Sequence, residues 1–99
     1  MKLLKSFLIE NSTTTADDIS SALDDKGVIV RRNAIRHSKA TPEHITKALD
    51  DKAWSVRSAA IRHPNANPEH ITKALDDESS IVRSAAKKRL SEISKNAAK

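Results

Sequence analysis

Cysteine is absent from the sequence, which excludes disulfides, thiolate nucleophiles, iron–sulfur clusters and cysteine-based zinc sites. Glycine occurs once and proline three times, too rarely for a turn-dense β fold or a flexible linker protein. The aromatic residues are one Phe and one Trp, so the core has to be aliphatic and rich in alanine. The lack of cysteine fits a reducing compartment, and we expect a cytoplasmic protein.

The N-terminal residues 1–14 begin like a signal peptide, with two lysines in a short apolar run. The run is too short to span a membrane, and Glu10 and Asn11 follow it without a small-residue cleavage site. We therefore expect this segment to be a helix that caps the fold. No part of the sequence is expected to cross a bilayer.

Positive charge is concentrated at the C-terminal end of the chain, whose net charge is +5. Residues 1–79 contain twelve Lys or Arg and twelve Asp or Glu, so they are neutral. Residues 80–99 contain six basic residues and only one acidic residue, Glu92. The C-terminal segment therefore carries the whole excess.

A repeat of 26 residues runs through most of the chain. The string Ala-Leu-Asp-Asp occurs at 22–25, 48–51 and 74–77. It defines three ungapped units, which are residues 15–40, 41–66 and 67–92. The second and third units agree at 15 of 26 positions and the first and second at 14, too many for chance.

Each unit is predicted to form two helices. The first helix follows an N-cap, which is Thr15, Thr41 or Asn67, and it carries an apolar i, i+3, i+4 stripe. The Asp-Asp pair is expected to close this helix and to cap the second one. The predicted helices are residues 2–11, 15–24, 28–37, 41–50, 54–63, 67–76 and 80–96.

Two sets of apolar positions define the expected core. In the first helices, we expect nearly full burial of Ile45, Leu49, Ile71 and Leu75. In the second helices, Ile35 and Ile61 share a column whose third member is Lys87. A polar residue in this column indicates that the stack of helices ends there, as in the terminal repeats of solenoids.

The run from Arg62 to Asp77, Arg-His-Pro-Asn-Ala-Asn-Pro-Glu-His-Ile-Thr-Lys-Ala-Leu-Asp-Asp, resembles the leucine-rich repeat variant, a HEAT-like helical repeat. A Val-Arg-x-x-Ala motif follows each Asp-Asp, and the resemblance covers residues 15 to about 90. The first unit departs from the pattern at residues 16–18. The resemblance implies a right-handed stack of helices, found in bacteria and tailed phages mostly as an interaction scaffold. Some relatives carry an iron–sulfur domain, not expected here, and a HEAT-like group of DNA glycosylases exists.

We therefore predict an all-α fold, a short right-handed α-solenoid of three 26-residue helix-pair repeats. It forms a single domain over residues 1–99, with an N-terminal capping helix in residues 1–14. The last repeat runs into a C-terminal capping helix that ends near residue 96. Its apolar positions are expected to pack on the third unit.

Arginine recurs at the same place in every unit, six residues after the second aspartate of the Asp-Asp pair. We expect each of these arginines, Arg31, Arg57 and Arg83, to pair with that aspartate and to tie the turn to the second helix. An arginine row that faces phosphates is the alternative.

A second set of basic residues lies near the ends of the second helices and in the C-terminal helix. Together with Trp54, they are the candidate partner-binding residues: Arg32, Arg36, Arg62, Lys87, Lys88, Arg89 and Trp54. A solvated edge that complements the helix dipoles is the alternative interpretation. We expect Trp54 to be partly buried at the edge of a layer and the residues at 87–89 to be exposed.

Histidine occurs as two pairs seven residues apart, His37/His44 and His63/His70. Their recurrence with the repeat favours a structural role over metal binding, which needs convergent ligands at short spacing. No nucleophile–base order, phosphate-binding glycine loop or carboxylate pair indicates catalysis. We predict no enzyme, cofactor, metal or small-molecule substrate.

The predicted function is that of a monomeric, non-catalytic module that binds another protein through a rigid helical-repeat face. The alternative is nucleic-acid binding through the basic residues of the second helices and the C-terminal helix. Charge favours this alternative, whereas the near-absence of aromatic residues disfavours stacking on single strands.

Overall fold

The computed structural model describes residues 13–97, which form six α-helices and no strand. The helices are α2 (Ala16–Ala22), α3 (Val28–Arg36), α4 (Pro42–Ala48), α5 (Trp54–Arg62), α6 (Pro68–Ala74) and α7 (Ser80–Ala97). Each end agrees with the sequence-based prediction to within two residues. The capping helix predicted in residues 1–14 falls on positions 1–12, which lie outside the described residues.

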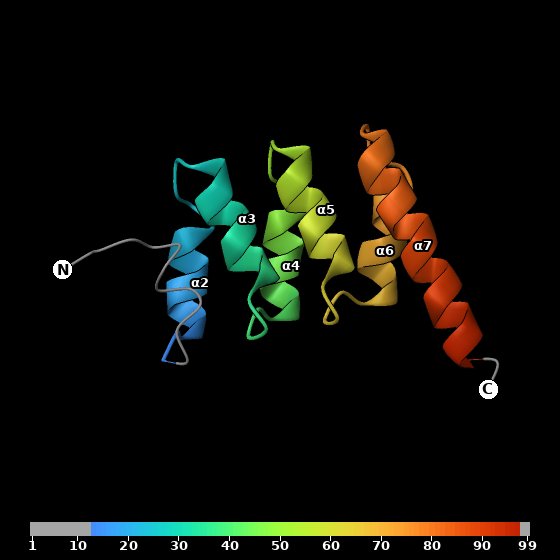
Figure 1. Cartoon of the computed structure of the whole chain (residues 1–99), viewed down its shortest axis with the longest axis horizontal. Helices are drawn as coiled ribbons and strands as arrows, with labels where there is room; N and C mark the ends of the chain where they lie inside the picture. The colour runs from blue at the N-terminus through green and yellow to red at the C-terminus, as the bar shows by residue number, and fades with distance from the viewer. Residues whose placement is uncertain (1–12, 98–99) are drawn as a thin grey trace.

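The helices follow one another in pairs along the longest axis of a body that measures 48 × 30 × 17 Å (Figure 1). Helix α3 contacts α5, and α5 contacts α7, so these three helices form a continuous row. Each of them also contacts the shorter helix that precedes it in the chain. No helix among residues 13–97 is long and apolar enough to cross a membrane.

The short helices α2, α4 and α6 are each fixed by a capping box. The side chains of Thr15, Thr41 and Asn67 accept a hydrogen bond from the backbone N–H three residues later. The side chain at that third position, which is Asp18, His44 or His70, accepts one from the N-cap N–H in return. Two orphan N–H groups are thus satisfied at each start, which stabilises helices of only seven residues.

The Asp-Asp pairs do not cap the second helices as predicted. The N-caps of α3 and α5 are Gly27 and Ala53, which make no side-chain cap bond. Asp51 instead accepts the backbone N–H of Ala53, two residues later, at 2.9 Å. This local bond shapes the turn between the two helices of the pair.

The core is a continuous cluster of aliphatic side chains, as the sparse aromatic composition requires. Its fully buried large members are Ile19, Ile35, Ile45, Ile61, Ile71, Val56 and Val82. Leu49 is also buried, because it lies beside Asp77 and Glu78 of the following pair. Leu75 is only partly buried, contrary to the prediction, since the last described helix pair has no such neighbour.

The end of the stack is marked by the column of Ile35, Ile61 and Lys87. The two isoleucines are fully buried between neighbouring pairs, whereas Lys87 is exposed on α7. The predicted change from apolar to polar is therefore confirmed. Farther along α7, Leu90 and Ile93 are partly buried and pack against the core.

The arginine ladder differs from the prediction, because each buried arginine joins two pairs of helices. The Arg57 Nε lies 2.9 Å from Oδ2 of Asp77, twenty residues later, and Nη2 donates to Oδ1 at 3.1 Å. Its Nη1 donates to the backbone carbonyl of Asp51, six residues earlier, at 2.7 Å. Arg31 binds the Asp51 carboxylate and the Asp25 carbonyl in the same way. The carboxylate partner is therefore the aspartate of the next pair.

Burial and pairing shift the ionisation of this ladder. The hydrogen bond with Asp77 raises the pKa of Arg57 despite the burial of its side chain. Burial alone would raise the pKa of Asp77, but hydrogen bonds from Arg57 and from the Ser79 N–H hold it below its ordinary value. Both groups are therefore charged at neutral pH, and Arg31 and Arg57 are buried and paired rather than facing phosphates.

The four histidines are part of the scaffold. Nδ1 of His44 accepts the Thr41 N–H at 2.9 Å, so the ring proton is on Nε2, which faces the carbonyl of Ala16 at 3.1 Å. Nε2 of His63 likewise donates to the carbonyl of His37 at 2.8 Å. Burial lowers the pKa of His70, which favours the neutral form that these bonds require.

Candidate functional site

The exposed side of the row α3, α5 and α7 contains two grooves, and we call this surface the groove face. The first groove, of about 500 Å³, is lined by Arg32, Arg36, Trp54, Ser55, Ser58, Ala59, Arg62, His63, Pro64 and Ile81. The second groove, of about 570 Å³, is lined by Arg62, Ser80, Ile81, Ser84, Ala85, Lys88, Arg89 and Glu92. The two grooves share Arg62 and Ile81, so they adjoin each other across α5 and α7.

The two grooves are built from equivalent positions 26 residues apart. Ser58 and Ala59 line the first groove, and Ser84 and Ala85 line the second. Small side chains at these positions leave space between the helices. The basic positions correspond as well, because Arg36 and Arg62 in the first groove match Arg62 and Lys88 in the second. The groove is therefore a recurring feature of the row.

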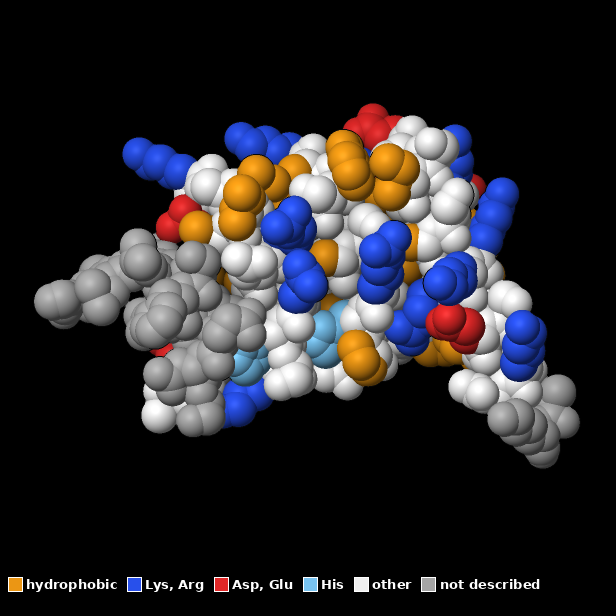
Figure 2. Space-filling model, in the orientation of Figure 1, with side chains coloured by type: hydrophobic (Ala, Val, Ile, Leu, Met, Phe, Trp, Pro, Cys, Tyr) orange, Lys and Arg blue, Asp and Glu red, His pale blue; other side chains and the backbone are white. Residues whose placement is uncertain are grey.

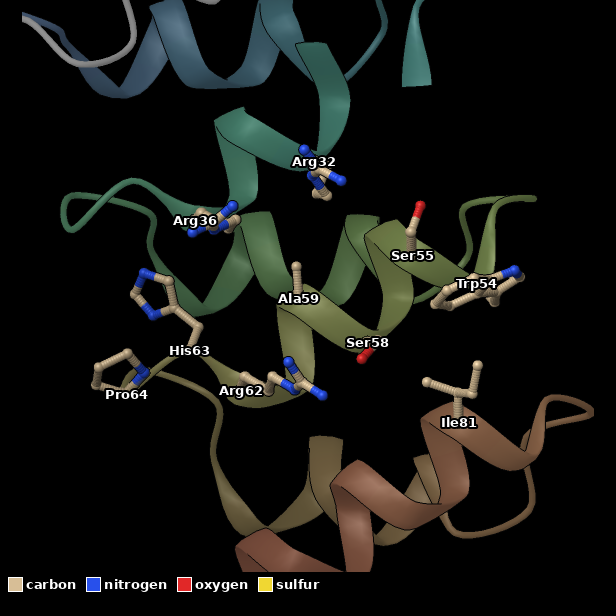
Figure 3. Close-up of a pocket in the computed structure, with 10 residues that line it drawn as sticks. All are labelled: Arg32, Arg36, Trp54, Ser55, Ser58, Ala59, Arg62, His63, Pro64 and Ile81. Carbon is tan, nitrogen blue, oxygen red and sulfur yellow. The ribbon is translucent and has the colours of Figure 1, made fainter. Parts of the chain in front are cut away.

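Large hydrophobic side chains are exposed at the starts of the helices of the row. Their exposed fractions are 40% for Val28, 56% for Ile29, 49% for Trp54 and 44% for Ile81. Figure 2 shows hydrophobic side chains in the upper part of this view, with Lys or Arg side chains beneath them. Trp54 was predicted to be partly buried, but it is exposed, because it begins α5 at the open end of the first groove (Figure 3).

Three arginines surround the floor of the first groove. In Figure 3, Arg32 and Arg36 come from α3 and Arg62 from α5, with Ala59 between them and Trp54 and Ile81 toward one end. No acidic side chain is among the residues that line this groove. Nε of Arg32 is buried and has no hydrogen-bond partner among the described residues. The groove thus has a donor that the rest of the described chain leaves unsatisfied.

The three basic residues predicted at 87–89 have different surroundings. Lys87 and Lys88 are exposed, and Lys88 alone of the two lines a groove. Arg89 is partly buried, contrary to the prediction, and its Nη1 donates to the carbonyls of Arg62 at 3.2 Å and His63 at 2.9 Å. It caps the end of α5, where helical carbonyls lack partners. Arg89 is therefore in part a structural residue.

Acidic residues gather on another part of the surface. Asp24, Asp25, Asp50 and Asp51 line one hollow beside the turns between paired helices. A second hollow of the same kind is lined by Asp50, Asp51, Asp77 and Glu78. In contrast, Glu92 is the one acidic residue that lines either groove. Charge of opposite sign is thus segregated between the turns and the groove face.

A metal site is not evident in the described part of the chain. No group of three or more histidine and acidic side chains in residues 13–97 is arranged to hold a metal ion. Nδ1 of each histidine, in His37, His44, His63 and His70, already accepts a backbone N–H. Its lone pair is therefore engaged in fixing the turns and helix starts.

Comparison of the chain with protein families, curated proteins and solved structures found no match. Function has therefore to be inferred from the residues and geometry of the chain itself.

Sequence reasoning found the basic residues and Trp54 of the groove face but missed its floor and Ile81. The small residues Ser58 and Ala59 recur at 84 and 85, and this recurrence outside the core stripe was an available signal. Ile81 immediately precedes the core residue Val82, and its isoleucine side chain alone gives no sign of exposure.

Proposed function

We propose that the chain is a non-catalytic protein-binding module that uses the groove face as its docking surface. In this proposal, the helix pairs are repeats of a short right-handed α-solenoid of the leucine-rich repeat variant or HEAT-like kind. The N-terminal segment and the C-terminal part of α7 close its two ends. Such stacks present a continuous face to a partner because each layer repeats the last.

The recurrence of individual bonds supports the repeat architecture. The Arg–Asp pair between Arg31 and Asp51 recurs between Arg57 and Asp77. The contact between Ser20 and the ring of His44 likewise recurs between Thr46 and the ring of His70. Bonds that link consecutive pairs with the same register are what stacking of equivalent layers requires.

The observation that carries the binding proposal is the group of four half-exposed hydrophobic side chains beside the grooves. Trp54 and Ile81 keep 49% and 44% of their surface in contact with water. A contiguous apolar patch rimmed by polar groups is typical of a protein-interaction site, and tryptophan and arginine are enriched in its most energetic contacts. Both residue types meet in the first groove.

Nucleic-acid binding is the second candidate, because Arg36, Arg62 and Lys88 recur at the two grooves and are exposed. A phosphate backbone would contact such a row, with an affinity that falls steeply with salt. The adjacent hydrophobic side chains would gain nothing from phosphates, and Trp54 is the only tryptophan or tyrosine that could stack on bases. We therefore favour a protein partner.

The proposal predicts that a double variant, Trp54→Ser with Ile81→Ser, loses its protein partner without losing its fold. Both side chains are about half exposed, so the melting temperature should change little. The measurement is capture of proteins from a lysate of the source organism by the immobilised wild-type chain and by the variant, followed by mass spectrometry.

A matched control is the double variant Glu43→Ser with Glu69→Ser, at equivalent exposed positions of α4 and α6. The control should retain the partner that the groove-face variant loses. Loss in both variants, or retention in both, would show that the docking surface is not the groove face.

A further inference from the structure

We infer that the partner segment is an acidic peptide with an apolar side chain, seated across the two grooves. This inference rests on the proposed function and specifies the chemistry of the partner. The carboxylates would pair with Arg32, Arg36 and Arg62, and the apolar side chain would contact Trp54 and Ile81. These five residues line one groove, so a single short segment can reach both kinds of contact.

The arginines favour carboxylates because their donors are unused within the described residues. Nε of Arg32 is buried without a partner, and no acidic residue lines the first groove. Elsewhere this chain satisfies the same group with a carboxylate, since Nε and Nη2 of Arg57 bind the two oxygens of Asp77. A carboxylate from outside would give Arg32 the same two-point pairing.

The apolar contact favours a peptide that carries a large aliphatic side chain. Trp54 and Ile81 flank the end of the first groove, away from Arg36 (Figure 3). Val28 and Ile29 extend the exposed apolar surface onto α3. Covering these side chains would remove apolar surface from water, which a free carboxylate or a phosphate cannot do.

The distribution of charge favours an acidic segment over a basic one. The acidic hollows lie at the turns between paired helices, whereas both grooves are lined by basic residues. The field of the chain therefore attracts negative charge to the groove face and repels it from the turns, which orients an approaching partner. The basic grooves and the exposed apolar residues thus agree on one occupant.

The test uses two blocked synthetic peptides of glutamate and glycine, one with a central pair of leucines and one with serines there. Trp54 is the sole tryptophan and the chain has no tyrosine, so its fluorescence reports binding at the groove. The glutamate–leucine peptide should bind and shift this fluorescence. The serine version should bind about tenfold more weakly, and a lysine–leucine version should not bind, because its charge is wrong for the grooves.

The matched variants are Arg62→Gln, in the side chain shared by both grooves, and Lys73→Gln, in an exposed cation of α6. Both remove one positive charge. Arg62→Gln should raise the dissociation constant of the glutamate–leucine peptide about tenfold, which is the effect of one charge-assisted hydrogen bond. Lys73→Gln should leave it nearly unchanged, and circular dichroism should show both variants folded.

Three results would overturn this inference. Equal losses in Arg62→Gln and Lys73→Gln would mean nonspecific attraction, and displacement of the peptide by a duplex DNA of the same concentration would favour nucleic acid. If no peptide binds while the Trp54 and Ile81 double variant loses its captured protein, the acidic-peptide inference fails but the proposed function stands. If neither experiment shows dependence on the groove face, both fail.

Discussion

Replacement of Asp77 by asparagine should lower the free energy of unfolding by about 3–5 kcal/mol, because it leaves a buried guanidinium without its carboxylate. Arg57 and Asp77 are only 7% and 13% exposed, and Nε lies 2.9 Å from Oδ2. Asp77 also accepts the N–H of Ser79 at 2.8 Å. The Asp77→Asn variant therefore disturbs both the link between two helix pairs and the turn before α7. Urea unfolding followed by circular dichroism measures the effect.

The pH dependence of this variant provides an internal check. Asp77 has a pKa below its ordinary value in the folded chain, so its stabilising contribution is complete above the ordinary carboxyl range and is lost as the pH falls through the lower value. Asparagine does not ionise. The difference in stability between Asp77→Asn and the wild type should therefore be largest at neutral pH and should shrink on acidification.

Asp76 supplies the matched control, because it precedes Asp77 in the sequence but is exposed. Asp76→Asn should change the free energy of unfolding by less than about 0.5 kcal/mol. Equal costs for the two variants would contradict the ladder of Arg–Asp pairs between helix pairs.

Replacement of Ile61 by alanine should cost about 2–5 kcal/mol, the usual cost when a large aliphatic side chain is removed from a packed core. Ile61 is fully buried on α5, the middle helix of the row, which contacts both α3 and α7. A domain of this size has few buried residues to spare. The variant Ile61→Ala could therefore be unfolded in part at physiological temperature, which thermal unfolding measures.

Lys87→Ala tests the same column at the end of the stack. Lys87 is exposed, so its removal should change stability by no more than about 0.5 kcal/mol. Ile61→Val should cost about 0.5–1.5 kcal/mol, between the other two variants. A large cost for Lys87→Ala would mean that another layer packs on α7 and that the stack does not end there.

Sequence periodicity was sufficient to predict the six described helices and most of the core. Caps such as Thr41 mark the helix starts, and the stripe of Ile45 and Leu49 marks the buried side, because burial on one face of a helix requires this spacing. Leu75 was misjudged since the same stripe continues into the last pair, where no following turn covers it. Periodicity describes a typical layer and not its end.

The same periodicity could not tell which aspartate each arginine binds. Arg57 follows Asp51 by six residues and precedes Asp77 by twenty. With a repeat of 26 residues, these two pairings predict the same pattern of residue types. The three-dimensional offset between consecutive pairs decides between them, and Arg57 binds the carboxylate of Asp77 and the carbonyl of Asp51.

The candidate site was predicted in its charges but not in its shape. Arg62 and Trp54 stand out by residue type, whereas the grooves depend on small floor residues such as Ala59 and on how closely α3, α5 and α7 approach. Arg89 was assigned to the free surface because its column partner His63 was not yet known to bind the preceding layer. His63 donates to the carbonyl of His37, and Arg89 donates to the carbonyl of His63.

The central claim, that partners dock on the groove face, is tested most directly by mapping amide chemical shifts. The isotope-labelled chain would be titrated with the glutamate–leucine peptide and with the captured partner protein. We predict that the largest shifts fall on the groove positions Ser58, Ala59, Ser84 and Ala85 and on the Trp54 indole N–H. Largest shifts on the exposed side of α4 and α6 would contradict the account.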